Sequence, residues 1–221
     1  MGKNKLRRFA ENETFTNLFQ HSEFEAREGL FPMKGKWHQE YFKNENPIIL
    51  ELGCGKGEYT IGMSQRYPDK NFIGIDRKGA RLWRGCKDAF EQNIPNVAFL
   101  RIKIEDIEHY FASGEVSEIW VTFPDPQLKK ERRRLVGPTM VNKFKKIFKQ
   151  PGIMHLKTDS RELYDYLKEE TVVQGWEIME DVYNVYTERP GTLLTEITTF
   201  YEEIWLKEGK LISYLQLKIN I

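Results

Sequence analysis

Short, largely apolar runs alternate with amphipathic segments along most of the chain. The runs end in glycine, proline or polar residues, which is typical of strands buried on both faces. The predicted strands in this alternating part are residues 47–52, 71–76, 97–102, 118–122 and 152–158. Helical spacing of apolar residues predicts helices over residues 59–66, 78–92, 136–148 and 162–170. Regular alternation of strand and helix predicts an α/β fold with a parallel sheet.

The rhythm changes in the last fifty or so residues. Residues 176–186 and 211–219 are predicted strands, with a short helix over 198–207 between them. We therefore predict a doubly wound, mostly parallel, seven-stranded Rossmann-like sheet with an antiparallel edge strand. Residues 47–221 would form this single domain, and residues 1–46 an irregular, basic segment packing on its core. Gly35-Lys36-Trp37 is the one feature that stands out in that segment.

Composition narrows the class of protein. Hydrophobic residues make up 40% of the chain, yet no apolar run approaches the ~20 residues that span a bilayer. The basic start has no following apolar stretch, so we expect no secretion signal. Two cysteines, Cys54 and Cys86, provide neither a disulfide framework nor a metal cluster. We expect a cytoplasmic, metal-free protein with no membrane association and no obligatory protein partner.

Charge is unevenly distributed behind a net charge of +1. Residues 129–149 carry nine Lys or Arg side chains against one acid, Glu131, and residues 1–8 carry four against none. Two basic blocks on a nearly neutral chain indicate an anionic partner such as nucleic acid. The alternative is a solvated helix face.

A glycine-rich loop follows the first predicted strand and opens a helix. Gly53, Gly55 and Gly57 permit a tight turn and close approach of a ligand to the backbone. The spacing G-x-G-x-G differs from the dinucleotide pattern, and Glu51 is unfavourable to a pyrophosphate but suits the cationic amino group of S-adenosylmethionine. Asp76 ends the second strand, where a carboxylate can accept hydrogen bonds from ribose hydroxyls. A methyl-donor site is favoured over a nicotinamide or flavin site and over a structural turn.

Two acids after the third predicted strand are further candidates for the donor site. Glu105 and Asp106 are placed to accept a hydrogen bond from the adenine amino group. Acids after strands are also common helix caps, and that alternative stays open.

Phe123-Pro124-Asp125-Pro126 follows the fourth predicted strand, at the sheet edge where ligands of open α/β sheets bind. Two prolines restrict the backbone around Asp125, which suits a preorganised contact and also an ordinary turn. Directly behind it lies a run of basic side chains able to bind phosphates. The candidate phosphate ligands are Lys129, Lys130, Arg132 and Arg133.

These motifs together resemble bacterial tRNA (guanine-N7)-methyltransferases. The resemblance rests on ELGCGKGEY, FPDP followed by KK and RRRLV, LKTD at 156–159 and TFYEE at 199–203, in that family's order and spacing. KNKLRRFAEN and GKW near the start extend it over nearly the whole chain. The glycine loop is shared by many methyltransferases, whereas FPDP with a basic tail and a late T-x-[FY]-E is more selective.

The resemblance implies methylation of guanine N7 in tRNA, at guanosine 46 of the variable loop, with S-adenosylmethionine as donor. It places Glu51, Asp76 and Glu105 at the donor, and Asp125 between donor and guanine as the catalytic group. Nucleotide-binding roles follow for Lys129, Asp159 and the stretch Thr199 to Glu202. Asp125 or Glu202 would accept hydrogen bonds from the guanine Watson–Crick edge, and Thr199 would add another.

One stretch departs from the family pattern. The family has an aromatic residue after FPDP and then a histidine, whereas this chain has Gln127 and Leu128 and no histidine there. His109 and His155 are possible replacements, although each is equally an ordinary structural histidine. Two other functions remain open: a non-catalytic nucleic-acid-binding protein, and a methyltransferase acting on a small molecule or a protein.

Overall fold

The computed structural model describes residues 2–220, with side chains from Asn4 onward. The chain separates into two compact units, one ending at Ala112 and the other beginning at Ser113. This division differs from the expected boundary between residues 46 and 47, which stays a prediction.

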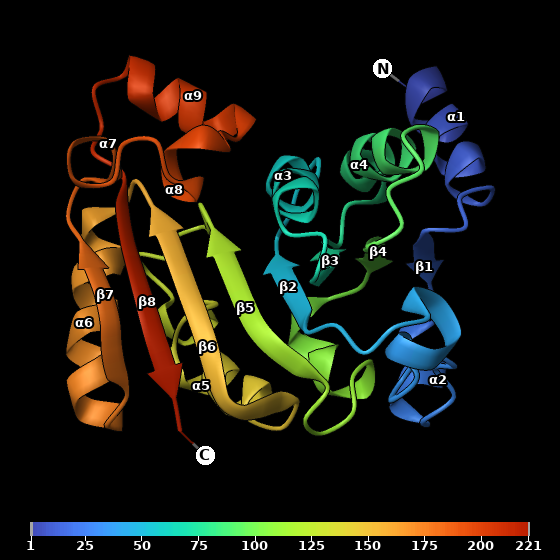
Figure 1. Ribbon diagram of the computed structural model, residues 1–221, viewed down its shortest axis with the longest axis horizontal. Coiled ribbons are helices and arrows are strands. Elements are labelled where there is room, and N and C mark those ends of the chain that lie inside the picture. The colour runs from blue at the N-terminus through green and yellow to red at the C-terminus, as the bar shows by residue number, and fades with distance from the viewer. Residues whose placement is uncertain (1, 221) are drawn as a thin grey trace. The chain divides into compact units, whose positions relative to one another are not determined.

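The first unit holds parallel strands in the order β1-β4-β3-β2 (Figure 1). The strands are β1 (Leu18–Gln20), β2 (Ile48–Leu52), β3 (Asn71–Ile75) and β4 (Val97–Arg101). Helix α3 (Glu58–Arg66) joins β2 to β3, α4 (Gly79–Glu91) joins β3 to β4, and the 3₁₀-helix η2 (Ile104–His109) follows β4. Because β2, β3 and β4 are parallel neighbours, the loops after their carboxyl ends gather at one edge.

Residues 2–46 contain regular elements, where the sequence analysis expected an irregular segment over 1–46. The elements are α1 (Gly2–Asn12), β1, α2 (Glu23–Arg27) and the π-helix η1 (Trp37–Phe42). Tertiary contacts order this segment: Nδ2 of Asn12 donates to the Gly79 carbonyl at 3.0 Å, and Trp37, fully buried, stacks on Phe111 at 5.8 Å between ring centroids. A three-residue strand and a six-residue π-helix are too short to leave a periodic pattern in the sequence.

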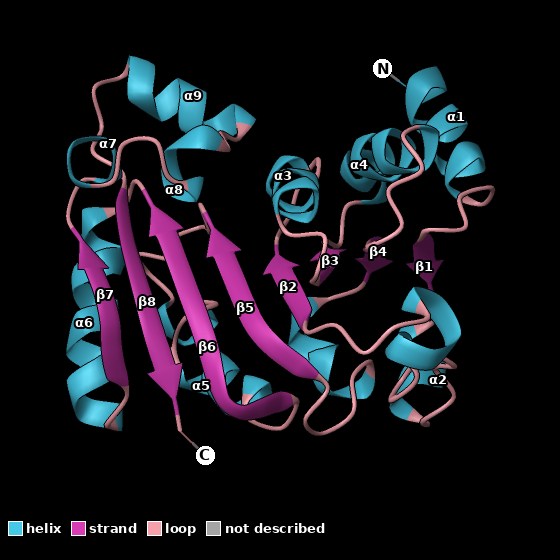
Figure 2. Cartoon of the chain, in the orientation of Figure 1, coloured by secondary structure: helices cyan, strands magenta, loops and turns pink. Residues whose placement is uncertain are grey.

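The second unit has strands in the order β5-β6-β8-β7. The strands are β5 (Val116–Thr122), β6 (Phe148–Thr158), β7 (Glu177–Val182) and β8 (Ser213–Ile219). β5 and β6 are parallel, and β8 runs antiparallel to both β6 and β7, as the arrow directions in Figure 2 show. The helices are η3 (Glu131–Arg133), α5 (Pro138–Phe144), α6 (Arg161–Gln174), α7 (Val185–Glu188), α8 (Leu193–Glu196) and α9 (Phe200–Lys207).

The predicted mostly parallel α/β fold with an antiparallel ending is confirmed. The described residues contain one strand more than predicted, because β1 was not expected. The strand predicted over 176–186 stops at Val182, since Asn184 caps α7 by accepting a hydrogen bond from the Tyr186 amide at 3.2 Å. The helix predicted over 136–148 ends at Phe144, and β6 begins at Phe148.

The core of each unit lies on its strands. Every residue of β2 and of β3 is buried, as expected for parallel strands covered on both faces. From residue 2 to residue 220, no helix is both long and apolar enough to cross a membrane.

Candidate active site

The glycine loop after β2 adopts a backbone that requires glycine. Gly53, Gly55 and Gly57 all have positive φ, at 75°, 60° and 78°. A Cβ on Gly57 would lie 2.7 Å from the Phe99 ring, so this glycine lets α3 pack on β4. At Gly55 a Cβ would meet nothing closer than the Gly53 carbonyl at 4.0 Å, which leaves the loop open to an approaching ligand.

Asp76, directly after β3, is fixed by the same loop. Its Oδ2 accepts a hydrogen bond from the Gly55 amide at 3.1 Å, and its Oδ1 accepts one from the Lys78 amide at 2.7 Å. The side chain is buried but for 8% of its surface. Each oxygen keeps a second lone pair, so the carboxylate can also accept hydrogen bonds from a ligand.

Glu51 is buried at the end of β2 and held from α3. The Thr60 amide donates to Glu51 Oε2 at 2.8 Å, and the Thr60 hydroxyl donates to the same oxygen. Thr60 is a site residue that the sequence analysis missed. Its position in the first turn of the helix after a glycine loop is the only signal that could have indicated it.

The electrostatics around this loop favour a cation. Burial raises the pKa of the Cys54 thiol well above its usual value, and the negative charges of Glu51 and Asp76 raise it further. The same charges that disfavour a thiolate disfavour a bound pyrophosphate and favour a sulfonium or ammonium group.

Glu105 and Asp106 lie at the start of η2 in different surroundings. Asp106 is buried, and Arg27 of α2 binds both its carboxylate oxygens, at 2.8 and 3.0 Å. Glu105 is exposed. The Arg27 pair favours a structural role for Asp106, tying α2 to η2, and leaves Glu105 as the candidate for an adenine contact.

In the second unit, Asp125 sits in an exposed, strained turn after β5. Phe123 and Gln127, on either side of it, have positive φ of 48° and 50°, an unusual conformation for residues other than glycine. One oxygen of Asp125 accepts a hydrogen bond from the Gln127 amide at 3.0 Å, as in an Asx turn. Strained backbone of this kind costs free energy and persists only where the surrounding structure holds it. It is found most often at functional sites.

The basic run divides into exposed and buried side chains. Lys129, Lys130, Arg132 and Arg133 are exposed around a pocket of about 580 Å³. Arg134 is buried: its guanidinium stacks over the Tyr166 ring at 4.1 Å, pairs with Glu162 at 3.0 Å and donates to the Pro126 carbonyl at 3.0 Å. Arg134 therefore holds the turn that contains Asp125.

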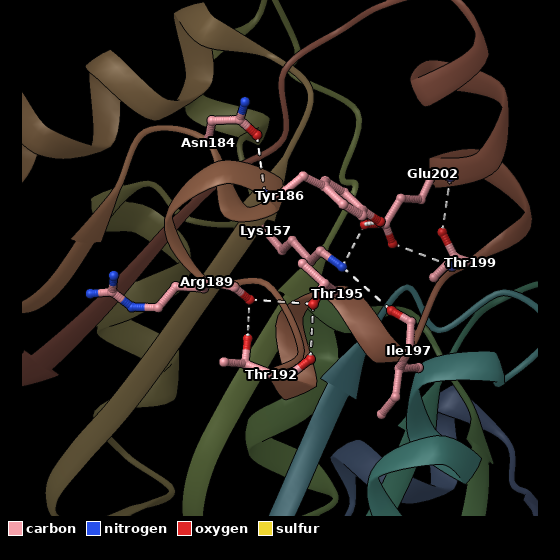
Figure 3. Close-up of polar contacts among 9 residues, drawn as sticks. All are labelled: Lys157, Asn184, Tyr186, Arg189, Thr192, Thr195, Ile197, Thr199 and Glu202. Atoms are coloured by element: carbon pink, nitrogen blue, oxygen red, sulfur yellow. Dashed lines mark hydrogen bonds and ion pairs between the residues drawn. The ribbon is translucent and has the colours of Figure 1, made fainter.

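Thr199 and Glu202, which the sequence analysis predicts to contact the base, lie in a buried polar cluster (Figure 3). They form a capping box at the start of α9, in which the Glu202 amide donates to Thr199 Oγ1 at 3.2 Å. Glu202 is fully buried; its Oε1 lies 2.6 Å from Lys157 Nζ and accepts from the Tyr186 hydroxyl at 2.9 Å. The T-x-x-E spacing is itself the signature of a capping box, which the sequence analysis could have recognised.

Lys157 on β6 connects this cluster to the turn at Asp125. Its ammonium is fully buried and lies 5.7 Å from the centroid of the Phe123 ring, while its carbonyl accepts from the Phe123 amide at 2.8 Å. Burial lowers the pKa of Lys157, and the charge of Glu202 opposes that change. A single residue thus contacts both Glu202 of α9 and Phe123, the residue directly before Pro124-Asp125-Pro126.

The remaining candidates have local partners. Asp159 pairs with Lys210 at 2.9 Å, and Lys210 stacks over Trp205. His155 is buried on β6, stacked on Trp120 at 3.9 Å between ring centroids, with Nδ1 2.8 Å from the Tyr214 hydroxyl. These contacts make His155 a structural residue. His109 lies 3.9 Å from Glu108, at the end of η2.

A parallel α/β unit with an open glycine loop and carboxylates after two adjacent strands defines the class of Rossmann-like methyltransferases. The solved structure of a 16S rRNA methyltransferase, KamB, shares the fold, with a TM-score of 0.65 and 16% identity over 92% of this chain and 96% of that one. A family model described as "Putative methyltransferase" matches residues 45–215.

Two relatives narrow the class to one family. The tRNA (guanine-N(7)-)-methyltransferase of Christiangramia forsetii is 51% identical over 99% of both chains. That of Bacteroides fragilis is 46% identical over 98% of this chain and 86% of its own length. The chain belongs to the bacterial tRNA (guanine-N(7)-)-methyltransferase family, as its motifs predicted.

Proposed function

We propose that this member of the family transfers the methyl group of S-adenosylmethionine to N7 of guanosine 46 in the variable loop of tRNA. The observation that carries the proposal is the loop of positive-φ glycines whose open face is bordered by Glu51 and the doubly anchored Asp76. Family membership supplies the substrate. Since that substrate is tRNA, we place its action in the cytoplasm.

The donor site is assigned to the first unit. Gly53, Gly55 and Gly57 allow the donor to approach the backbone, and Asp76 accepts hydrogen bonds from the ribose hydroxyls. Glu51 supplies negative charge for the amino group, and Glu105 accepts from the adenine amino group. The bound donor supplies an activated methyl group and its own leaving group, so no metal is needed for the transfer.

Asp125 is assigned to the acceptor. Guanine N7 carries an exposed lone pair and needs no strong base, so the enzyme mainly aligns N7 with the methyl carbon. Positive charge develops on the guanine ring as the methyl group arrives, and the negative Asp125 carboxylate stabilises it. The carboxylate oxygen that does not accept from Gln127 is the one available to the base.

Phosphate binding is assigned to the exposed side chains of Lys129, Lys130, Arg132 and Arg133. Asp159 is assigned to the nucleotide. For Thr199 and Glu202 we propose an indirect role: their side chains are occupied by the capping box and by Lys157, so they shape the nucleotide site through the backbone that they hold.

The test is incubation of the protein with labelled S-adenosylmethionine and total tRNA, followed by nucleoside analysis. We expect 7-methylguanosine, with label absent when guanosine 46 is replaced by adenosine in a tRNA transcript. Label in a different nucleoside would overturn the assignment of the base. Salt-dependent tRNA binding without donor binding would identify a non-catalytic RNA-binding protein.

A further inference from the structure

A second basic surface lies in the first unit, away from the basic run of residues 129–134 in the sequence. On α4, Arg81 and Arg84 are three residues apart and share one face of the helix. They border a pocket of about 680 Å³, which Lys56 of the glycine loop and Arg8 of α1 also line. None of these four side chains has a role in the proposed methyl transfer.

Arg8 of α1 contacts the neighbouring helix α4 at two residues, Ala80 and Trp83. Its guanidinium stacks over the Trp83 ring at 4.7 Å, and its Nη1 donates to the Ala80 carbonyl at 3.4 Å. Its Nε is buried and has no hydrogen-bond partner among the described residues. Arg8 also lines the pocket, and its guanidinium has N–H donors beyond the one that bonds Ala80, so it can contribute positive charge and a donor to an anion there.

The charge balance of the pocket is positive. Its acidic lining residues are Glu58 and Asp88, against four cations. Asp88 already pairs with Arg84 at 2.8 Å, an exposed pair of neighbouring turns that leaves the other guanidinium nitrogens of Arg84 able to donate. Guanidinium groups bind the oxygens of phosphates and carboxylates in paired geometry, so the pocket matches an oxyanion better than an apolar ligand.

Further basic residues lie on or next to the helices that line the pocket. Arg77 and Lys78 precede α4, and Lys5 and Arg7 lie on α1, which packs along α4. A small phosphorylated molecule would need the pocket alone, whereas a nucleic acid backbone presents phosphates at regular intervals to a row of cations.

We propose that the pocket between α1, α3 and α4 binds backbone phosphates of the tRNA, at nucleotides other than the one that is methylated. The inference rests on the proposed function, since it takes tRNA as the substrate. It assigns tRNA contacts to the first unit in addition to those proposed for the basic run of the second.

The test is tRNA binding by the double variant Arg81→Gln/Arg84→Gln, measured over a series of salt concentrations. Each phosphate that is no longer neutralised lowers the slope of log affinity against log salt by about 0.9. We expect the slope to fall by about two and the dissociation constant at ~0.15 M salt to rise about tenfold or more. S-adenosylmethionine affinity and the circular dichroism melting curve should stay unchanged.

The matched control is Arg66→Gln/Lys70→Gln, which removes the same charge at the last residue of α3 and in the turn between α3 and β3. It should leave the salt slope as in the wild type. An unchanged slope in the pocket variant overturns the inference. Inorganic phosphate binding, measured by calorimetry, combined with that unchanged slope would assign the pocket to a small anion. The measured quantity is tRNA binding and not methyl transfer. A protein that formed no 7-methylguanosine would contradict the proposed function but would leave the result of this binding test unchanged.

Discussion

Charged side chains of the second unit differ in burial and in how many of their hydrogen-bonding atoms are already used. Lys157 and Glu202 are both fully buried and neutralise each other, whereas Asp125 is exposed with one oxygen held by a neighbouring amide. A buried, fully paired carboxylate can fix a backbone but cannot reach a substrate without breaking its pair. An exposed, half-used carboxylate keeps acceptor capacity for a ligand, which is why we assign the chemistry to Asp125.

Asp125→Asn should separate the chemical role from the turn. Asparagine makes similar local turns, so the hydrogen bond with Gln127 should persist. The negative charge is removed, and we expect the rate of 7-methylguanosine formation to fall about a hundredfold, the scale of removing one preorganised electrostatic interaction. Single-turnover kinetics with tRNA measures it. Near-normal turnover with normal folding would leave Asp125 as a turn residue only.

Lys157→Met should destabilise the second unit. The substitution leaves Glu202 buried without its counter-charge, and we expect a loss of about 3–5 kcal/mol in the free energy of unfolding, measured by denaturant titration. The double variant Lys157→Met/Glu202→Gln is the matched comparison, since it removes both charges. It should recover a substantial part of the loss. Equal stability of the single variant and the wild type would contradict the account of the pair.

Among the elements, the glycine loop between β2 and α3 has the most specific geometry. Its three glycines have positive φ. The Gly55 amide donates a hydrogen bond to Asp76, and Gly57 packs closely against the Phe99 ring, so both contacts fix the backbone of the loop. Gly85 of α4 belongs to the same arrangement, because a Cβ there would lie 2.6 Å from the Lys56 carbonyl. The close approach of α4 to the loop thus follows from small residues on both elements.

Gly55→Val should abolish or strongly weaken donor binding. A branched side chain is strained at φ 60°, and it would occupy the open face of the loop. Calorimetry with S-adenosylmethionine measures the effect, and no NAD binding is expected for either protein. Gly29→Val is the control, since it has the same kind of backbone, at φ 78°, outside the donor site. Undiminished donor binding by Gly55→Val would remove the loop from the site.

At the scale of the whole molecule, charge is segregated. A net charge of +1 coexists with nine basic residues and one acid between residues 129 and 149. Segregation of this kind gives RNA binding that depends on salt, while the protein as a whole stays nearly neutral.

The variant Lys130→Ala/Arg132→Ala/Arg133→Ala should weaken tRNA binding and lower its salt slope by roughly one unit for each phosphate that these side chains neutralise. The three side chains are exposed, so the melting temperature should change little. Salt-dependent binding assays measure the slope. Arg134→Lys is the contrasting variant. Arg134 is buried against Pro126, Glu162 and Tyr166, so this substitution should lower the melting temperature more than it lowers the salt slope. A triple variant with the wild-type slope would reduce the run to a solvated face.

Local pattern predicted those parts of the molecule that depend on neighbouring residues. The alternation of apolar and amphipathic segments identified the parallel strands β2 to β6 and the antiparallel ending. The glycine spacing and the strand-end acids predicted a tight loop beside Asp76, which the structure contains, because backbone conformation and strand direction follow from residues close in sequence. That this loop binds the donor stays a prediction. The family motifs narrowed the predicted substrate to guanine in tRNA.

The partner and the burial of each polar side chain were decided only by the tertiary structure. Glu202 pairs with a lysine 45 residues earlier in the chain, Asp106 with Arg27, and Arg134 with Glu162. The order of residues 2–46 likewise comes from interactions with distant segments, such as the hydrogen bond from Asn12 to Gly79. A sequence records periodicity over a few turns, whereas the free energy of a charged or aromatic side chain depends on what surrounds it, and folding supplies those surroundings from remote parts of the chain.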